Sequence, residues 1–124
     1  MSAQTNRVAV EHGHTVCITA SFQEHPTAEE ALATLREWKG AESTWSLPSR
    51  PEHPLAVADD ADRPQPRRDV NAGNGMTVTV GRVREDRILD LRMVALGHNT
   101  IRGAAGGSVL NAELLAATGM LPPA

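Results

Sequence analysis

Apolar and polar side chains alternate most clearly between residues 14 and 22, where valine, isoleucine and alanine are separated by threonine, cysteine and serine. A period of two is typical of a strand with one buried face. Residues 76–80 and 88–96 alternate in the same way. We therefore predict strands at these three places, with a turn at residues 85–87 and a further short strand near residues 55–57.

A helix is predicted directly after the first of these strands. Pro26 stops the strand, and Thr27 followed by Glu30 forms a capping box. Apolar residues then fall on one helical face. These are Ala28, Ala31, Leu32, Leu35 and Trp38. Gly40 suits the C-terminal cap of this helix.

Residues 47–75 form the long irregular part of the chain. The segment is charged and punctuated by glycine, and its prolines exclude regular helix. These prolines are Pro48, Pro51, Pro54, Pro64 and Pro66. A segment of this kind in a compact domain is a functional loop, an interface arm or a disordered linker.

The order of elements predicts an α+β fold. We expect a mixed or mostly antiparallel sheet of three or four strands, one covering helix and a C-terminal helix. One helix cannot cover such a sheet completely, so a face or an edge stays unpaired. The chain should therefore have a partner, which is either another copy or a missing domain.

The composition limits the class of protein. The chain has 124 residues, enough for one domain or part of one, and a net charge of −3 that argues against nucleic-acid and membrane surfaces. No apolar run approaches the roughly 20 residues that span a bilayer. The N-terminal residues lack the pattern of a secretory signal. Cys17 is the single cysteine, which excludes an internal disulfide and suits a reducing cytoplasm.

Glycines gather where the C-terminal helix begins. The stretch 98–107, HNTIRGAAGG, opens a helix predicted over residues 100–118, before the Pro122-Pro123 tail. Glycine inside a helix costs about 1 kcal/mol relative to alanine, so the run needs a reason. One possible reason is binding of an anionic ligand by the free N–H groups of the helix N-terminus, and the other is tight packing of the helix on the sheet. The pattern alone does not choose between them.

Arg7 and His14 are the first candidates for chemistry, because residues 7–10 and the strand from residue 14 could be extended chain around a turn at Gly13. Arginine offers a planar fork for a carboxylate, and histidine titrates near neutrality. His12 competes with His14 for the role of acid and base. His12, His14 and Cys17 do not complete a four-ligand metal site, so we expect no metal. We expect His25 and His53 to be solvated.

Four ordered segments carry a resemblance to a known family. They are RVAVEHGHT at 7–15, LPSRPEHPL at 47–55, DRPQPRRDVNAGNGMTVTVGRVRED at 62–86 and HNTIRGAAGGSVLNAELL at 98–115. Together they resemble the C-terminal part of aspartate-semialdehyde dehydrogenases of the branch found in archaea, fungi and some bacteria. The resemblance runs from about residue 5 to residue 119.

The resemblance implies an activity. Enzymes of this family interconvert 4-aspartyl phosphate and L-aspartate 4-semialdehyde with NADP, on the route to lysine, threonine and methionine. Arg7 would hold the substrate carboxylate, and His14 would be the acid and base. The family more often has proline where this chain has Ala9, a change that removes no reactive group.

The resemblance also implies cofactor contacts and partners. Residues 1–97 would belong to the catalytic and dimerisation domain, and residues 98–124 would pack on an NADP-binding domain. Cofactor contacts would fall on Asn99, Thr100, Gly103 and Ala104. Residues 63–76 would form an arm over the active site or the dimer interface, and Arg82 and Arg84 could pair across an interface. The expected partners are a homo-oligomer, dimer or tetramer, or a missing N-terminal NADP-binding part.

Two parts of the family pattern are missing. The Gly73-Asn74-Gly75 run follows prolines rather than a strand, so it is not the glycine-rich fingerprint that binds a dinucleotide. The nucleophilic cysteine of the family precedes the segment that resembles residues 7–15, and we interpret Cys17 as a small, semi-buried residue. We therefore expect the last part of the enzyme, inactive by itself and marginally stable. Met1 could be a native start, an internal start or the start of a truncated gene model.

Two other hypotheses remain open. The first is another acyl reduction on the same scaffold, such as malonyl-CoA reduction. The second is a non-catalytic dimerisation module or the remnant of a gene.

Overall fold

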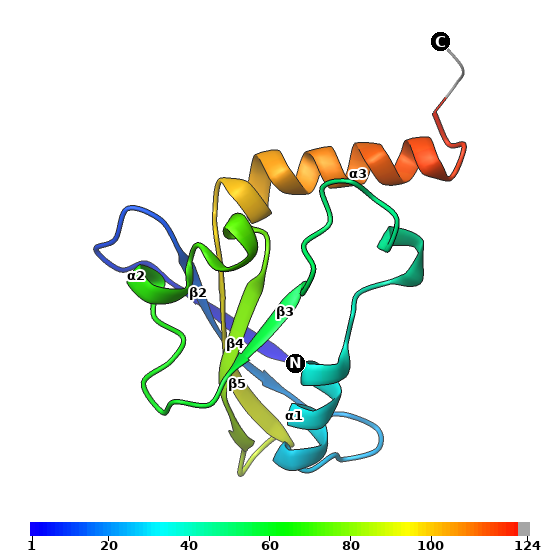
Figure 1. Cartoon of the computed structure of the whole chain (residues 1–124). Helices are drawn as coiled ribbons and strands as arrows, with labels where there is room; N and C mark the ends of the chain where they lie inside the picture. Colours follow the sequence, from blue (N-terminus) through cyan, green and yellow to red (C-terminus); the bar gives the residue numbers. More distant parts are fainter. Residues whose placement is uncertain (122–124) are drawn as a thin grey trace.

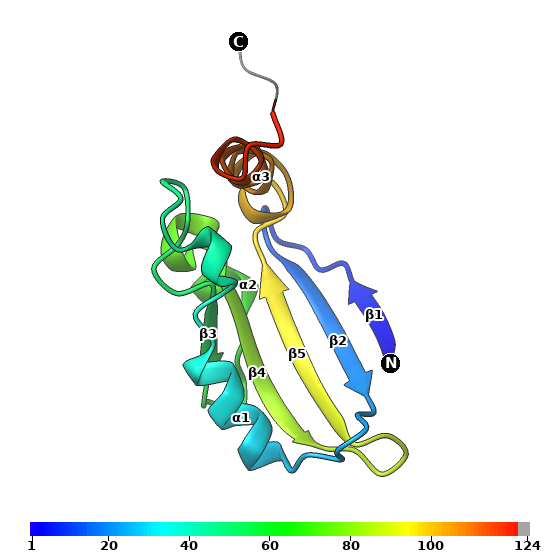
Figure 2. The same ribbon diagram turned by 90° about the vertical axis from the view of Figure 1, so that its right-hand side faces the viewer.

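The computed structural model describes residues 1–121, which form a five-stranded sheet with helices on its faces and across one end (Figures 1 and 2). The strand order is β1-β2-β5-β4-β3. The strands are β1 (Ser2–Asn6), β2 (His14–Ala20), β3 (Leu55–Ala58), β4 (Val78–Glu85) and β5 (Leu91–Gly97). All neighbours are antiparallel except β3 and β4, which are parallel. The expected α+β class with a mixed sheet is confirmed.

The sheet has one strand more than the sequence predicted. β1 was missed because its residues, SAQTN, are polar and show no alternation; pairing with the edge of β2 holds them extended. The expectation of extended chain at residues 7–10 was wrong. These residues form an irregular loop between β1 and β2, and we call residues 7–13 the His12 loop.

Helix α1 (Ala28–Glu37) covers part of one face of the sheet, against β3 and β4. The capping box is present: Thr27 accepts a hydrogen bond from the N–H of Glu30, and the Glu30 carboxylate accepts one from the N–H of Thr27. The helix ends earlier than predicted, with Trp38 as its C-cap, and Gly40 follows two residues later. Trp38 is half exposed rather than part of the core.

The turn between β4 and β5 explains why the last strand begins later than predicted. The Asp86 carboxylate accepts hydrogen bonds from the N–H groups of Ile88 and Leu89, at 3.1 and 3.0 Å. This local bonding holds the chain out of the sheet until Leu91, and Ile88 is almost fully exposed. Leu91 and Leu96 are both 1 % exposed, and their odd spacing places them on opposite faces of the sheet.

The exclusion of regular helix from residues 47–75 was wrong for residues 66–69. α2 (Pro66–Asp69) begins at a proline, which is tolerated in a first turn because its missing N–H would have no partner there. η2 (Ala72–Gly75) follows after Val70 and Asn71 and is not regular helix, because Gly73 and Asn74 both have φ of 54°. η1 (Glu42–Thr44) precedes the segment as another short turn. The predicted strand near residues 55–57 is confirmed as β3.

The C-terminal helix lies across the end of the sheet (Figure 1). It opens with the π-helical turn η3 (Ile101–Ala105) and continues as α3 (Gly106–Ala117), which has no buried residue. Glu113 ties it to the loop before β3, because its carboxylate accepts hydrogen bonds from the N–H and Oγ of Ser49 at 2.9 and 2.7 Å. The predicted Pro122-Pro123 tail lies outside the described residues.

Candidate active site

The His12 loop meets the start of the C-terminal helix at one end of the sheet. The backbone N–H of Gly13 donates a hydrogen bond of 2.8 Å to Oδ1 of Asn99. Gly13 has φ of 116°, and a Cβ there would lie 2.9 Å from Cβ of Pro66. Glycine is therefore required for the turn that brings His14 into β2 beside β5.

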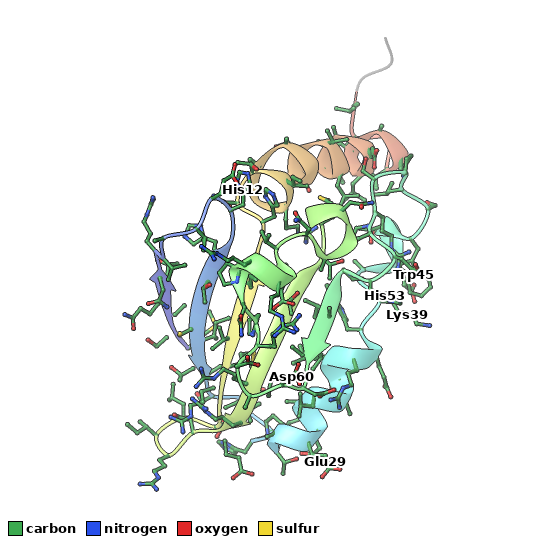
Figure 3. The ribbon with its side chains drawn as sticks, turned by 60° about the vertical axis from the view of Figure 1, so that its left-hand side comes forward. His12, Glu29, Lys39, Trp45, His53 and Asp60 are labelled. Carbon is green, nitrogen blue, oxygen red and sulfur yellow. The ribbon has the colours of Figure 1, made fainter. Side chains whose placement is uncertain are left out.

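His98 joins the same two segments, and the sequence interpretation missed it. The residue is 4 % exposed, and its Nδ1 accepts hydrogen bonds from the N–H groups of Thr100 and Ile101, at 3.2 and 3.1 Å. Its ring stacks on that of His12, with centroids 4.7 Å apart. Figure 3 shows His12 beside the beginning of the C-terminal helix. No sequence signal points to His98, because the N-cap of this helix is Thr100, an ordinary capping residue whose side chain makes no capping hydrogen bond here.

Two cavities share the side chains of His14 and Asn99. The first, of about 150 Å³, is also lined by Arg7 and Gly13. We call it the Arg7 cavity. The second, of about 340 Å³, is also lined by Gly103 and lies at the start of the C-terminal helix. We call it the Gly103 cavity.

Three predicted site residues therefore surround one point of the fold. Arg7, His14 and Asn99 line the Arg7 cavity, as the sequence suggested for the first two, although the His12 loop rather than a strand carries Arg7. Arg7 and His14 are exposed, so both can meet a ligand from solvent. An arginine and a histidine at one cavity can bind a carboxylate and move a proton beside it.

The other two predicted cofactor residues lie differently. Thr100 uses its N–H on His98, and its hydroxyl is also 3.2 Å from Nδ1 of His98. Ala104 is exposed, and neither Thr100 nor Ala104 is among the residues that line the Gly103 cavity. Arg102 lines that cavity and was not among the candidates.

The glycine run is explained mainly by packing. A Cβ on Gly106 would lie 2.4 Å from Sδ of Met76, and one on Gly107 would lie 2.5 Å from the carbonyl oxygen of Arg102. The first N–H groups of the helix are occupied by His98, so they do not form the open anion site that the pattern allowed. Gly103 differs, because a Cβ there would meet only the His98 carbonyl oxygen, at 3.5 Å. Gly103 leaves open space beside the cavity.

Cys17 does not belong to this site. His14 and Cys17 are three residues apart on β2, which places them on opposite faces of the sheet. The expectation of a semi-buried cysteine was wrong: Cys17 is exposed, and its sulfur lies 3.4 Å from Nδ2 of Asn6. Within residues 1–121, no three His, Cys, Asp or Glu side chains are grouped so that they could hold a metal ion.

The two remaining histidines lie away from both cavities. His53 is mostly exposed, as expected. His25 is exposed too, but its Nδ1 lies 2.7 Å from Oδ1 of Asp90, so it is paired and not simply solvated. The His25 ring and the N–H of Phe22 hold the pKa of Asp90 below its usual value.

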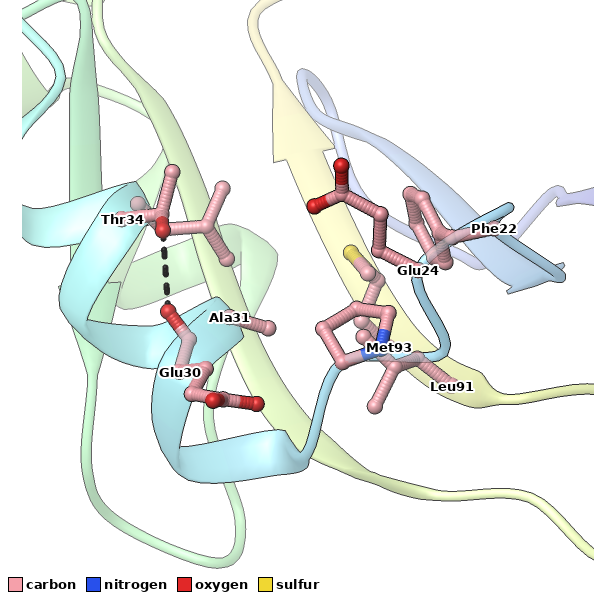
Figure 4. Close-up of a pocket in the computed structure, with 9 residues that line it drawn as sticks. Phe22, Glu24, Glu30, Ala31, Thr34, Leu91 and Met93 are labelled. Atoms are coloured by element: carbon pink, nitrogen blue, oxygen red, sulfur yellow. Dashed lines mark hydrogen bonds between the residues drawn. The ribbon is translucent and has the colours of Figure 1, made fainter.

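A larger groove of about 470 Å³ lies between α1 and β5, away from the candidate site (Figure 4). Leu91, Met93 and Phe22 give it an apolar wall. Glu30 lines it as well, but its carboxylate is engaged in the capping box, and those hydrogen bonds lower its pKa. The groove brings together no acid, base or nucleophile from the sequence candidates.

Comparison with known proteins agrees with this architecture. Residues 1–102 match the family model of the semialdehyde dehydrogenase dimerisation domain. That match covers more than half of the chain, so this protein belongs to the semialdehyde dehydrogenase family, and the region that matches is its dimerisation domain. No helix in the described residues is long and apolar enough to cross a membrane.

The relatives define the branch. Aspartate-semialdehyde dehydrogenase of Archaeoglobus fulgidus is 47 % identical over 115 residues, which are 93 % of this chain and 32 % of that protein. The solved structure of the Candida albicans enzyme with NADP has a TM-score of 0.76 and 46 % identity, covering 88 % of this chain and 31 % of that one. Malonyl CoA reductase (NADP) of Metallosphaera sedula is 40 % identical over 98 % of this chain and 34 % of its own length. This chain thus spans about a third of these relatives and corresponds to their C-terminal part.

Proposed function

We propose that this chain is the C-terminal catalytic and dimerisation part of an NADP-dependent aspartate-semialdehyde dehydrogenase. The assembled enzyme would interconvert 4-aspartyl phosphate and L-aspartate 4-semialdehyde, in the synthesis of lysine, threonine and methionine. The observation that carries the proposal is the meeting of Arg7, His14 and Asn99 at one cavity, in a chain of this family.

Each of these residues has a role in the proposal. Arg7 binds the substrate carboxylate through its planar guanidinium, which suits two parallel hydrogen bonds. His14 takes and returns the proton at the reacting carbon's oxygen, because its exposed imidazole lines the cavity. Asn99 keeps His14 in place by holding the N–H of the preceding Gly13.

The Gly103 cavity fits the nicotinamide end of NADP. Gly103 leaves room for a flat ring to approach the backbone, and Asn99 supplies an amide at the same cavity. When bound, NADP would accept the hydride from the substrate. Thr100 and Ala104 remain proposed contacts at the same turn. The nucleophilic cysteine and the glycine-rich fingerprint would belong to another part of the enzyme, and this chain alone would be inactive.

We further propose that residues 98–124 dock on the NADP-binding part, while residues 1–97 form the catalytic and dimerisation domain. The unburied surface of α3 supports this division. The assembled enzyme would be a homo-oligomer, dimer or tetramer, in the cytoplasm. Residues 63–76 would contribute an arm to the active site or the dimer interface, and Arg82 and Arg84 would pair at an interface.

Malonyl-CoA reduction is the second candidate, favoured by the 40 % identity to the Metallosphaera sedula enzyme. The pocket that distinguishes the two substrates would lie partly in the N-terminal part. A third candidate is a dimerisation module without catalysis, which the exposed, polar edge strand β1 equally allows.

Two chimeras test these candidates. In each, this chain replaces the corresponding C-terminal third of a relative, either the Archaeoglobus fulgidus dehydrogenase or the Metallosphaera sedula reductase. We expect the first chimera to oxidise L-aspartate 4-semialdehyde with NADP and phosphate. Retained malonyl-CoA reduction in the second chimera, without semialdehyde oxidation in the first, would favour the second candidate. Two chimeras that assemble and bind NADP without turnover would leave the dimerisation module.

A further inference from the structure

The stacked pair His12 and His98 connects the two halves of the candidate site. His12 belongs to the loop that carries Arg7, and His98 precedes the helix that carries Gly103. His98 is buried, and its Cδ2 would lie 3.2 Å from a Cβ on Gly75, which is itself buried and has φ of 82°. The His98 imidazole therefore contacts both segments, through its stacking on His12 and through its hydrogen bonds to the first turn of the helix.

We propose that His98 is a positioning residue: its neutral imidazole, with the proton on Nε2, holds the His12 loop against the first turn of the C-terminal helix and thereby keeps His14 beside Asn99. The consequence for catalysis rests on the proposed function of His14. The structural part of the proposal does not, because it concerns the chain without substrate or cofactor.

The hydrogen bonds determine the tautomer. Nδ1 of His98 accepts from the N–H groups of Thr100 and Ile101, so Nδ1 carries no proton and Nε2 does. Imidazolium donates from both nitrogens, so a protonated His98 would turn an N–H toward two N–H groups. Protonation therefore removes the cap of this helix.

The surroundings favour the neutral ring. Burial, and secondly the positive charge that His12 can carry, lower the pKa of His98 below its usual value. The positive end of the helix acts in the same direction. Arg102 and His14 are the other titratable groups at the cavity that His98 lines. Glu11 lies 3.9 Å from Nε2 of His12, and Arg67 lines the same cavity as Glu11 and His12.

A falling pH should therefore loosen a defined part of the site. When His98 is protonated, the N–H groups of Thr100 and Ile101 lose their acceptor, and the stacking of its ring on His12 weakens. The helix start and the His12 loop then separate, and the hydrogen bond from Gly13 to Asn99 weakens. The central strands stay paired, because their hydrogen bonds do not involve His98.

Hydrogen exchange in the 124-residue chain tests the proposal, with rates corrected for their intrinsic pH dependence. We expect the amides of Thr100, Ile101 and Gly13 to exchange about tenfold faster once the pH falls below the pKa of His98 measured by NMR on the same sample. The amides of Val80 and Ala95 in the central strands are the control, and should keep their protection.

Two variants separate the cap from packing. His98→Asn keeps a side-chain acceptor that does not titrate, so the three amides should stay protected at every pH. His98→Phe keeps a flat ring without an acceptor, so they should exchange fast at every pH while Val80 and Ala95 stay protected. If the isolated variants do not fold, peptides covering residues 8–14 and 98–103 of the chimera give the same comparison.

The proposal is overturned if the three amides of the wild-type chain keep their protection through the titration of His98, or if His98→Phe behaves as His98→Asn does. Loss of turnover in the chimera plays no part in this test. A failure of the proposed function and a failure of this inference are therefore distinguishable.

Discussion

Asn99 holds the backbone of Gly13, 86 residues away in sequence, through a hydrogen bond of 2.8 Å from the Gly13 N–H to its Oδ1. This contact joins the loop after β1 to the second residue after β5. It explains why the residues proposed for substrate and cofactor meet, since His14 follows Gly13 directly and Gly103 follows Asn99 by one helical turn. The site depends on this long-range contact and not on one continuous motif.

Removing the acceptor should loosen the His12 loop more than it destabilises the fold. Asn99→Ala leaves the exposed Gly13 turn able to bond with water, so the free energy of unfolding should fall by about 0.5–1 kcal/mol or less. The Gly13 amide should lose its protection from hydrogen exchange. Asn99→Asp keeps an acceptor at the same place and should retain that protection. Equal protection in both variants would contradict the role given to Oδ1.

Gly103→Ala should separate cofactor binding from stability. The added Cβ makes an ordinary contact of 3.5 Å, and alanine is the better helix former, so stability should be unchanged or rise by up to about 1 kcal/mol. In the chimera, the Kd for NADP should rise about tenfold, because the methyl group enters the Gly103 cavity. An unchanged Kd would remove Gly103 from the proposed contacts.

Gly107→Ala is the matched variant one turn further along the helix. Its Cβ would lie 2.5 Å from the carbonyl oxygen of Arg102, so the backbone must shift. We expect a loss of about 1–3 kcal/mol in the free energy of unfolding, measured by urea denaturation. A stability equal to that of Gly103→Ala would show that the two glycines are not distinguished by packing.

Asp69 should be the residue of the proline-rich segment that matters most for stability. Its side chain is 5 % exposed and pairs with Arg63, and it also accepts a hydrogen bond of 2.6 Å from the N–H of Gln65. Asp69→Asn leaves Arg63 without its buried counter-charge, so unfolding should become easier by about 2–3 kcal/mol at pH 7. Asp62→Asn, at an exposed carboxylate of the same segment, should change stability by less than about 0.5 kcal/mol.

The same residue gives the chain a defined acid sensitivity. The hydrogen bond from Arg63, and next the N–H of Gln65, lower the pKa of Asp69 in the folded chain. A lowered pKa means that the unfolded chain binds the proton more readily, so the stabilisation is complete above the usual aspartate pKa of about 3.9 and is lost as the pH falls through the folded value. Stability curves of Asp69→Asn should therefore be flatter than those of the wild type below about pH 4. Parallel curves would contradict this.

The sequence predicted those elements whose signal is local. β2, β4 and β5 follow their alternation, and the capping box of Thr27 is present as expected. β1 could not be predicted, because its polar residues are held only by pairing with β2. α2 was missed for the opposite reason, since a proline that forbids helix in the middle of a segment is well placed at its start.

The residues of the candidate site also differ in whether a local sequence pattern or a long-range contact identifies them. Arg7 and His14 could be proposed from their spacing, and the structure brings them to one cavity. His98 could not, because its importance comes from contacts with His12 and with the helix that follows it. The glycines of the run serve two purposes: Gly106 permits tight packing, and Gly103 leaves open space. The sequence could not distinguish these purposes, because they depend on the positions of Met76 and of the cavity.

The most direct test of the account is the turnover of L-aspartate 4-semialdehyde by the Archaeoglobus fulgidus chimera with His14→Asn, compared with His53→Asn. His53 is an exposed histidine outside both cavities, so the same substitution there controls for the loss of an imidazole. We expect His14→Asn to lower kcat by about 100-fold or more, with assembly and NADP binding retained, and His53→Asn to leave kcat unchanged. An assembled His14→Asn chimera that turns over as fast as the His53→Asn chimera would contradict the central claim.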